Sequence, residues 1–298
     1  MEITLSPEQI LAVAAATGTT NNLLIFACAG GAKTTTMCAI ARAFGPGRRI
    51  VALAFGTDAA ESLSQKMPYY VESSTFHKFC YDALGAALGR KPRPDGIRCR
   101  WLLKKLVPEW KARVAVQDAV LTLVSRFKST TADPTDTNAL ASVADRFDIE
   151  ATPSILDLAQ RVLSRCAEDR NPKTIDFDDM LWLPWLWNIP FPPVAVVLLD
   201  EAQDTNGVQR ALLSRILAPK QIQRPVVLND PQYNGVGIEI PIPRLIAVGD
   251  SHQSIYGFRG ADGEAMSLLR SEFNMTELAL SVSYRCSQAV VAEAQKYL

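Results

Sequence analysis

The chain has 298 residues, of which 48% are hydrophobic and 21% charged, the proportions of a folded globular protein. Its 31 basic and 31 acidic residues leave no net charge, so nucleic-acid binding would depend on a local surface rather than on an overall field. The longest apolar runs fall far short of the roughly 20 residues that cross a bilayer, so we expect no membrane partner. We expect a location in the cytoplasm, which includes the nucleoid and the cytoplasm of a phage-infected bacterium.

Short apolar runs alternate with helical patterns over the first eighty residues. The pattern predicts strands at residues 23–27 and 50–55, and helices at residues 33–44 and 58–67. This alternation is typical of a parallel α/β sheet with crossover helices.

Strand signals vanish between residues 82 and 174, where helical patterns are broken at four prolines, Pro92, Pro94, Pro134 and Pro172. We interpret this stretch as a helical insertion. It contains a basic segment, residues 90–113, with nine basic residues and only two acidic ones. This segment is compatible with a solvated helix face and equally with a surface that contacts phosphates.

The later part of the chain returns to strand patterns. Residues 194–199, VAVVLL, are apolar throughout, as expected of a central parallel strand covered on both faces. Further strands are predicted at residues 245–248 and 277–280, and residues 219–243 read as an elaborated loop. An amphipathic helix begins at residue 287 and has no terminating glycine, which indicates a piece of a longer protein.

The six cysteines are scattered through the chain without a CxxC pair, and there are only two histidines. This usage fits a reduced compartment and argues against a structural zinc site.

The stretch FACAGGAKTTTM, residues 26–37, has the layout of a phosphate-binding loop between a strand and a helix. Gly30 and Gly31 occupy the turn, Lys33 suits the β- and γ-phosphates, and Thr34 suits Mg²⁺. The nucleotide-binding candidates in this loop are Ala29, Gly30, Gly31, Ala32, Lys33, Thr34 and Thr35.

The loop departs from the pattern G-x-x-x-x-G-K-[ST] at both glycines, which are Ala27 and Ala32 here. If residue 32 needs an unusual φ angle, its methyl group strains the loop by roughly 1 kcal/mol or more. Alone, the loop is equally compatible with a structural turn that contains two glycines.

A second element follows the apolar strand at residues 194–199, which ends in Asp200 and Glu201. At this end of an open α/β sheet, Asp200 can hold Mg²⁺ through its water shell, and Glu201 can orient and deprotonate a water molecule. An Asp-Glu pair paired with a Lys-Thr loop in one sheet is seldom accidental.

Eight short segments, distributed from residue 5 to residue 287, form a recognisable series along the chain. They are LSPEQ (5–9), ACAGGAKT (27–34), ALAFGTDAAESL (52–63), STFHKFC (74–80), DFDDML (176–181), LLDEAQDT (198–205), VGDSHQSIYGFRGAD (248–262) and SYRCS (283–287). In this order they resemble the motifs of superfamily 1 DNA helicases of the UvrD/Rep/PcrA type, particularly phage-like members.

The resemblance implies a RecA-like P-loop NTPase domain of α/β class, with a parallel sheet and an inserted helical subdomain. The RecA-like domain would comprise residues 1–81 and 176–281, the helical subdomain residues 82–175, and residues 282–298 would begin a second RecA-like domain. The cofactors implied are ATP and Mg²⁺, and the partners are single-stranded DNA and that second domain.

The resemblance also implies roles for individual residues at the nucleotide. Gln9 would bind adenine, Tyr284 would stack on the base, and Thr34 and Asp200 would serve Mg²⁺. The catalytic residues would be Lys33, Glu201, Gln253, which senses the γ-phosphate, and Arg285, which stabilises its charge.

The residues implied in contact with single-stranded DNA are Phe55, Thr75, His77, Tyr256, Phe258 and Arg259. Aromatic stacking on bases tolerates any sequence, which suits such a role. Tyr256 and Phe258 lie in a polar stretch that favours contact with DNA, whereas Phe55 follows a buried strand and could equally pack in the core. For His77, hydrogen bonding is expected rather than metal binding.

The chain departs from the family at several positions. Cys28 and Ala32 replace glycines, and Thr57-Asp58 replaces the usual Asn-Lys, which exchanges a basic residue for an acidic one near the expected DNA path. These helicases hydrolyse ATP between two RecA-like domains, and only residues 286–298 follow Arg285. We therefore expect the isolated chain to hydrolyse ATP poorly and not to unwind duplex DNA.

These observations favour the N-terminal motor half of an ATP-dependent translocase on single-stranded DNA, a DNA helicase. The resemblance suggests 3′-to-5′ movement. One alternative is a nucleotide- or DNA-binding module without catalysis, in which Ala32 marks a degenerate loop. A small-molecule phosphotransferase is disfavoured, because it would explain neither QSIYGFRG nor TFHKF.

Overall fold

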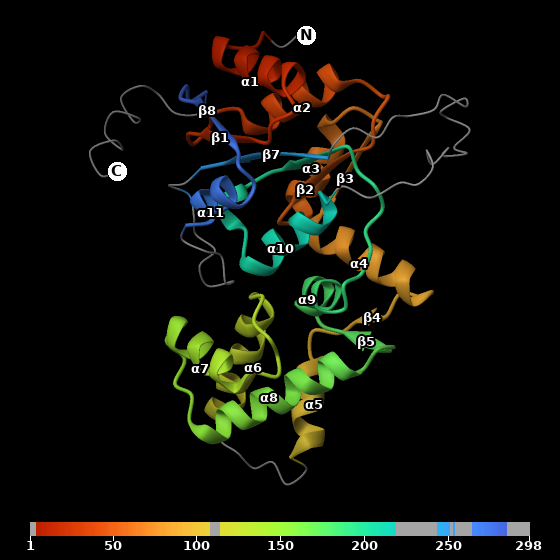
Figure 1. The fold of residues 1–298 in the computed structure, drawn as a ribbon, viewed down its shortest axis with the longest axis vertical. Helices are drawn as coiled ribbons and strands as arrows, with labels where there is room; N and C mark the ends of the chain where they lie inside the picture. Colours follow the sequence, from red (N-terminus) through yellow and green to blue (C-terminus); the bar gives the residue numbers. More distant parts are fainter. Residues whose placement is uncertain (1–3, 108–113, 219–242, 251–252, 254–263, 285–298) are drawn as a thin grey trace. The chain divides into compact units, whose positions relative to one another are not determined.

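The computed structural model describes residues 4–107, 114–218, 243–250, 253 and 264–284. The chain divides into two compact units (Figure 1). The first unit comprises Met1–Phe76, Pro192–Thr205 and Leu213–Leu298, and the second comprises His77–Phe191 and Asn206–Leu212. The sequence-predicted loop at residues 219–243 and the helix from residue 287 lie outside the described residues, apart from Pro243.

The first unit is built on a parallel sheet, as predicted, and the sheet has six strands, one of which, β3, the sequence did not predict. Its strands have the order β3-β2-β6-β7-β1-β8. Their bounds are β1 Leu23–Ala27, β2 Ile50–Ala54, β3 Val71–Thr75, β6 Val196–Leu199, β7 Arg244–Gly249 and β8 Thr276–Leu280. The apolar strand β6 lies between β2 and β7 and is buried throughout, which confirms its predicted central position.

Helices cover both faces of this sheet (Figure 1). The helices α1 (Pro7–Gly18), α2 (Lys33–Phe44) and α3 (Thr57–Lys66) share one core with alternate residues of the strands, such as Leu23, Ile25 and Ile50. The helix α11 (Ala265–Glu272) packs near β1 on the other face. A short helix, η1 (Ala202–Asp204), follows β6, and α10 (Gly207–Ile216) comes next in the chain.

The second unit is mainly helical. It contains the helices α4 (Phe76–Leu88), α5 (Arg98–Leu106), α6 (Val114–Lys128), α7 (Thr137–Arg146), α8 (Pro153–Glu168) and α9 (Asp179–Leu186). It also contains a feature that the sequence did not predict, a parallel pair of two-residue strands, β4 (Arg93–Pro94) and β5 (Thr174–Ile175). The unit extends beyond the predicted insertion at residues 82–175 on both sides.

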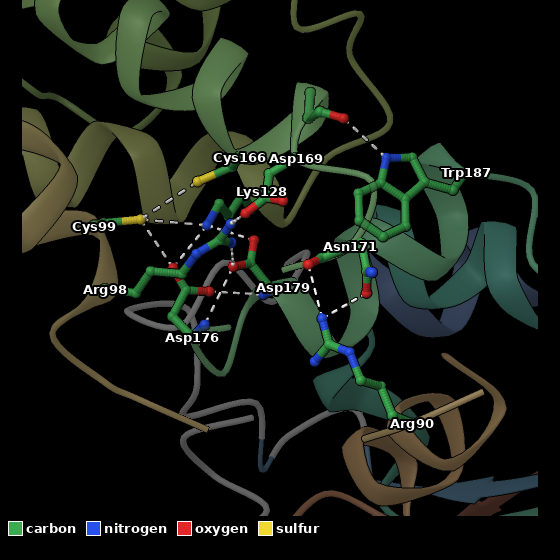
Figure 2. Close-up of polar contacts among 11 residues, drawn as sticks. Arg90, Arg98, Cys99, Lys128, Cys166, Asp169, Asn171, Asp176, Asp179 and Trp187 are labelled. Atoms are coloured by element: carbon green, nitrogen blue, oxygen red, sulfur yellow. Dashed lines mark hydrogen bonds and ion pairs between the residues drawn. The ribbon is translucent and has the colours of Figure 1, made fainter. Parts of the chain in front are cut away.

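A network of buried charges lies in the core of the second unit (Figure 2). Lys128, only 1% exposed, places its Nζ 2.7 Å from Asp176 Oδ2 and 2.7 Å from Asp179 Oδ1. Arg98 also forms an ion pair with Asp179, and the Cys99 thiol donates a hydrogen bond to Asp176. Burial lowers the pKa of Lys128, but Asp176 and Asp179 raise it well above its ordinary value, so the ammonium stays charged.

This network changes the interpretation of two sequence features. Arg98 belongs to the basic segment at residues 90–113, yet it is buried and ion-paired and does not contribute to a phosphate-contacting surface. Asp176 and Asp179 belong to the DFDDML segment, and in the described structure both form ion pairs with Lys128 in the core of the second unit. None of the helices in the described ranges has the length and apolar character needed to cross a membrane.

We predict that Lys128→Met destabilises the protein strongly. Removing the ammonium leaves the Asp176 and Asp179 carboxylates buried without their main partner, which costs about 3 to 5 kcal/mol. Urea denaturation measures the difference. The control is Lys105→Met on the exposed face of α5, which should change the unfolding free energy by less than about 0.5 kcal/mol. Equal midpoints for the two variants would contradict this account.

Candidate functional site

The candidate site lies at the carboxyl edge of the sheet in the first unit. Because all six strands are parallel, the segments that follow β1, β6, β7 and β8 all leave the sheet at this edge. These segments contain the phosphate-loop candidate, Asp200 with Glu201, Asp250, and the stretch that leads to Tyr284. The topology therefore brings together segments as distant in the sequence as Ala29 and Ser283, which are 254 residues apart.

The loop between β1 and α2 is tightly folded. Gly30 has a φ of 76°, which favours glycine, and a Cβ added at Gly31 would lie 2.8 Å from the Cys28 carbonyl oxygen. The backbone N–H of Tyr284 donates to the Gly30 carbonyl at 3.0 Å, and the Ser283 hydroxyl donates to the Ala29 carbonyl at 2.7 Å. The segment after β8 therefore holds the loop in place.

Ala32 directly precedes α2 and has a left-handed backbone, with φ 55° and ψ 37°. The condition under which its methyl group strains the loop is therefore met. The Ala32 carbonyl accepts hydrogen bonds from the backbone and the side chain of Thr36, at 3.0 and 3.2 Å. The loop thus keeps its conformation despite the missing glycine, and the half-buried Thr34 and Thr35 begin the first turn of α2.

Lys33 and Glu201 form an ion pair that joins the loop to the end of β6. Lys33 is the first residue of α2, and Glu201 has a left-handed backbone with φ 48° and ψ 47°. Such a conformation is strained for a residue with a side chain and is often found at functional sites. The pair places an ammonium and a carboxylate together where phosphates would bind.

Asp200 is 6% exposed, directly after β6, and its carboxylate accepts the backbone N–H of Glu201 at 3.0 Å. Burial, together with the charge of Glu201, raises the pKa of Asp200 to about 6. A buried carboxylate that resists ionisation fits the site of a cation. The Asp200 carboxylate and the Thr34 hydroxyl are oxygen donors of the kind that Mg²⁺ prefers.

Gln9 is almost fully buried, and both ends of its amide are engaged in the fold. Its Oε1 accepts the backbone N–H of Ser6 at 2.9 Å, which completes a capping box at the start of α1. Its Nε2 donates to the Thr36 hydroxyl at 3.0 Å. In this structure Gln9 fixes α1 against α2, and its implied contact with adenine stays a prediction.

Two further candidates lie at the same edge. Tyr284 is 60% exposed while its backbone contacts the loop at Gly30, an arrangement that leaves its ring available for stacking. Gln253 donates its side-chain amide to Asp250 at 2.8 Å. The remaining candidates Arg285, Tyr256, Phe258 and Arg259 lie outside the described residues.

The other three residues implied in DNA contact are described. Phe55 directly follows β2 and is half-buried, an exposure that is compatible with core packing and equally with DNA contact. Thr75 is the last residue of β3 and also lies at the carboxyl edge. His77 belongs to α4 in the second unit. Thr57 and Asp58 are exposed at the start of α3.

Sequence reasoning assigned no role to Gln203 or Asp250, two buried polar residues of the same site. The Gln203 amide contacts Glu201 and the backbone of Asp250, and Asp250 in turn accepts a hydrogen bond from Gln253. The signal was present, since both residues lie inside segments quoted for the resemblance, LLDEAQDT and VGDSHQSIYGFRGAD.

A six-stranded parallel sheet with a lysine-bearing loop after one strand and an Asp-Glu pair after another defines a RecA-like P-loop domain. The sequence pattern of the UvrD/REP helicase N-terminal domain matches residues 5–274, so the chain belongs to this family.

Curated relatives agree with this assignment. The chain is 28% identical to the ATP-dependent DNA helicase UvrD1 of Mycobacterium tuberculosis, over 93% of this chain and 37% of the relative. It is 27% identical to the ATP-dependent DNA helicase Rep of Escherichia coli, over 97% and 42%. It is 23% identical to a probable DNA helicase II homolog of Mycoplasma genitalium, over 84% and 36%. The chain thus spans about two fifths of the length of these relatives.

We predict that Ala32→Gly raises the stability of the protein, because glycine adopts a φ of 55° without strain. The gain should be up to about 1 kcal/mol, since the extra freedom of the unfolded chain offsets part of it. The matched control is Ala14→Gly on the exposed side of α1, which should instead lose about 1 kcal/mol. Urea denaturation of both variants checks the opposite signs, and a loss of stability in both would refute the strain at Ala32.

We predict that Asp200→Asn stabilises the metal-free protein at pH 8. The pKa of Asp200 is raised from 3.8 to about 6, so its ionisation lowers the free energy of unfolding as the pH rises from about 4 to about 6. The neutral amide removes this loss, on the order of 1 to 3 kcal/mol. Thermal unfolding from pH 4 to pH 8 should show a gain that shrinks toward pH 4. Glu61→Gln, exposed on α3, should show no such gain.

Proposed function

We propose that this chain is the N-terminal motor half of an ATP-dependent translocase on single-stranded DNA, a DNA helicase. The observation that carries the proposal is the ion pair between Lys33 and Glu201, at a tightly held loop in a domain of the UvrD/REP family. In this proposal, as the resemblance implies, the RecA-like domain comprises residues 1–81 and 176–281 and the helical subdomain residues 82–175. The second compact unit, His77–Phe191 with Asn206–Leu212, also includes residues on both sides of that subdomain.

The residues of the carboxyl edge would act on the nucleotide as follows. The ammonium of Lys33 leaves the Glu201 carboxylate and binds the β- and γ-phosphates, which the backbone of residues 29–32 encloses. Freed from Lys33, Glu201 orients the attacking water and accepts its proton. The Thr34 hydroxyl and the Asp200 carboxylate would hold Mg²⁺, which would neutralise phosphate charge when bound. Tyr284 stacks on the base.

Residues at the neighbouring strand ends would serve single-stranded DNA. Phe55 after β2 and Thr75 at the end of β3 lie at the same edge as the nucleotide site, which supports a DNA path there. By resemblance the path also involves His77, Tyr256, Phe258 and Arg259. Stacking would then supply sequence-independent binding, whereas Asp58 would weaken one backbone contact.

A second RecA-like domain, beginning near residue 282, would complete the motor. The share of the relatives' length that the chain spans supports this, since about three fifths of each relative has no counterpart here. In the proposal Gln253 senses the γ-phosphate and Arg285 stabilises the charge on that phosphate. Both would act where this half meets the second domain. The isolated chain therefore turns over ATP slowly and does not unwind duplex DNA. The protein would work in the cytoplasm or on the nucleoid.

The left-handed backbone of Ala32 also supports the alternative function, a module that binds nucleotide or DNA without catalysis. In that case the strained loop would bind Mg-ATP poorly until residue 32 became glycine. Titration of the Ala32→Gly variant with nucleotide separates the two proposals, because the motor half already binds Mg-ATP with alanine in place.

We predict that Lys33→Ala weakens nucleotide binding at least about tenfold. A fluorescent ATP analogue with Mg²⁺, titrated into the purified chain, should bind the unchanged protein and lose at least about tenfold in affinity with the variant, since one charge-assisted contact to phosphate is lost. The control is Lys105→Ala, an exposed lysine on α5 in the second unit, which should bind like the unchanged protein. Equal affinity for the Lys33 variant would contradict the nucleotide site.

A further inference from the structure

Gln203 lies between the two strand ends that form the nucleotide site. It belongs to η1, directly beyond Glu201, and is only 3% exposed. Both ends of its amide are engaged within the first unit. Its Nε2 donates to Glu201 Oε2 at 2.8 Å, and its Oε1 accepts the backbone N–H of Asp250 at 3.0 Å. A buried amide with both ends satisfied has a defined orientation.

The position is also shaped to admit this amide. A Cβ added at Gly249 would lie 2.6 Å from Gln203 Oε1 and 3.1 Å from its backbone nitrogen. Any side chain at residue 249 would therefore displace Gln203, because Cβ atoms do not approach other atoms so closely. The glycine at the end of β7 allows the two strand ends to be joined through one side chain.

The contacts continue on both sides of Gln203. Glu201 Oε2 also receives the Lys33 ammonium, and the Asp250 carboxylate accepts the side-chain amide of Gln253 at 2.8 Å. A continuous polar chain thus runs from the phosphate loop, through Glu201 and Gln203, to Asp250 and Gln253. It joins the residue proposed as base to the residue proposed to sense the γ-phosphate.

We propose that Gln203 is a positioning residue that orients the Glu201 carboxylate for catalysis and joins it to the end of β7. This inference rests on the proposed function. When phosphate takes the Lys33 ammonium, the Gln203 amide still donates to the same carboxylate oxygen. This hydrogen bond fixes the orientation of the Glu201 carboxylate and leaves its other oxygen for the water. As the water oxygen bonds to the γ-phosphorus, the bond to the ADP oxygen breaks and the water proton passes to Glu201.

The test is single-turnover hydrolysis of ATP by the whole 298-residue chain in excess, with Mg²⁺ and a single-stranded oligonucleotide, from pH 5.5 to pH 9. The informative variant is Gln203→Glu, which keeps the acceptor for Asp250 and replaces the donor to Glu201 by a carboxyl group. At pH 8 the new side chain is a carboxylate and donates no hydrogen bond to Glu201, so the rate should fall about tenfold or more. The affinity for Mg-ATP should stay within about twofold, because within the described part of the chain the Gln203 side chain hydrogen-bonds Glu201 and Asp250 and not the phosphate loop.

A lower pH should restore the activity of this variant. When the new carboxyl is protonated, it can donate to Glu201 as the amide does, so the rate should recover between about pH 8 and pH 6. Gln203→Met removes both hydrogen bonds and should be slow at every pH. The control Gln65→Glu makes the same change on the exposed face of α3 and should follow the unchanged chain.

The outcomes separate this inference from the proposed function. An unchanged rate and pH profile for Gln203→Glu would overturn the positioning role and leave the motor proposal standing. A chain that binds Mg-ATP but hydrolyses none of it would overturn the inference while nucleotide binding stands. A chain that binds no nucleotide would overturn the proposed function itself. A slow Gln203→Glu variant without recovery at low pH would indicate a structural role alone and would also overturn the inference.

Discussion

The parallel arrangement of the sheet is the constraint on which the rest of the site depends. Because β1, β6, β7 and β8 run in the same direction, their carboxyl ends meet at one edge. Between two such strands the chain must return to the opposite edge of the sheet through a crossover connection. The segments between the strands can therefore be long, as the stretch from β3 to β6 is, while the strand ends still meet at this edge. Lys33 and Glu201 meet only because β1 and β6 both flank β7.

Several unfavourable features gather at this edge. Ala32 and Glu201 have left-handed backbones, and Asp200 is a carboxyl held out of water. None of them stabilises the fold, and each lies where a ligand would find a preorganised amide, ammonium or carboxylate. The surrounding structure compensates through the apolar strands and the contacts of residues 283 and 284 with the loop. The site is thus maintained at the expense of stability, as binding sites commonly are.

The sequence predicted the fold well where local patterns were strong. The limits of β1 and α2 agree with the prediction to the residue, because an apolar run, a glycine turn and an amphipathic stretch follow one another. The edge strand β3 was missed because VESST is mostly polar. The loop motif was recognised, but the φ of Ala32 depends on tertiary contacts that no local pattern reports. The buried partners of Lys128 also could not be predicted, since Asp176 lies 48 residues away.

Resemblance alone does not report which residues of a motif also hold the fold together. Gln9 caps α1 and contacts Thr36, and Asp176 and Asp179 neutralise a buried lysine, although all three belong to motif segments. Gln203 is the opposite case, a buried polar residue whose contacts lead directly to the candidate base. What distinguishes them is where the hydrogen bonds end. Those of Gln9 end at the cap of α1 and in α2, whereas those of Gln203 join two strand ends of the candidate site.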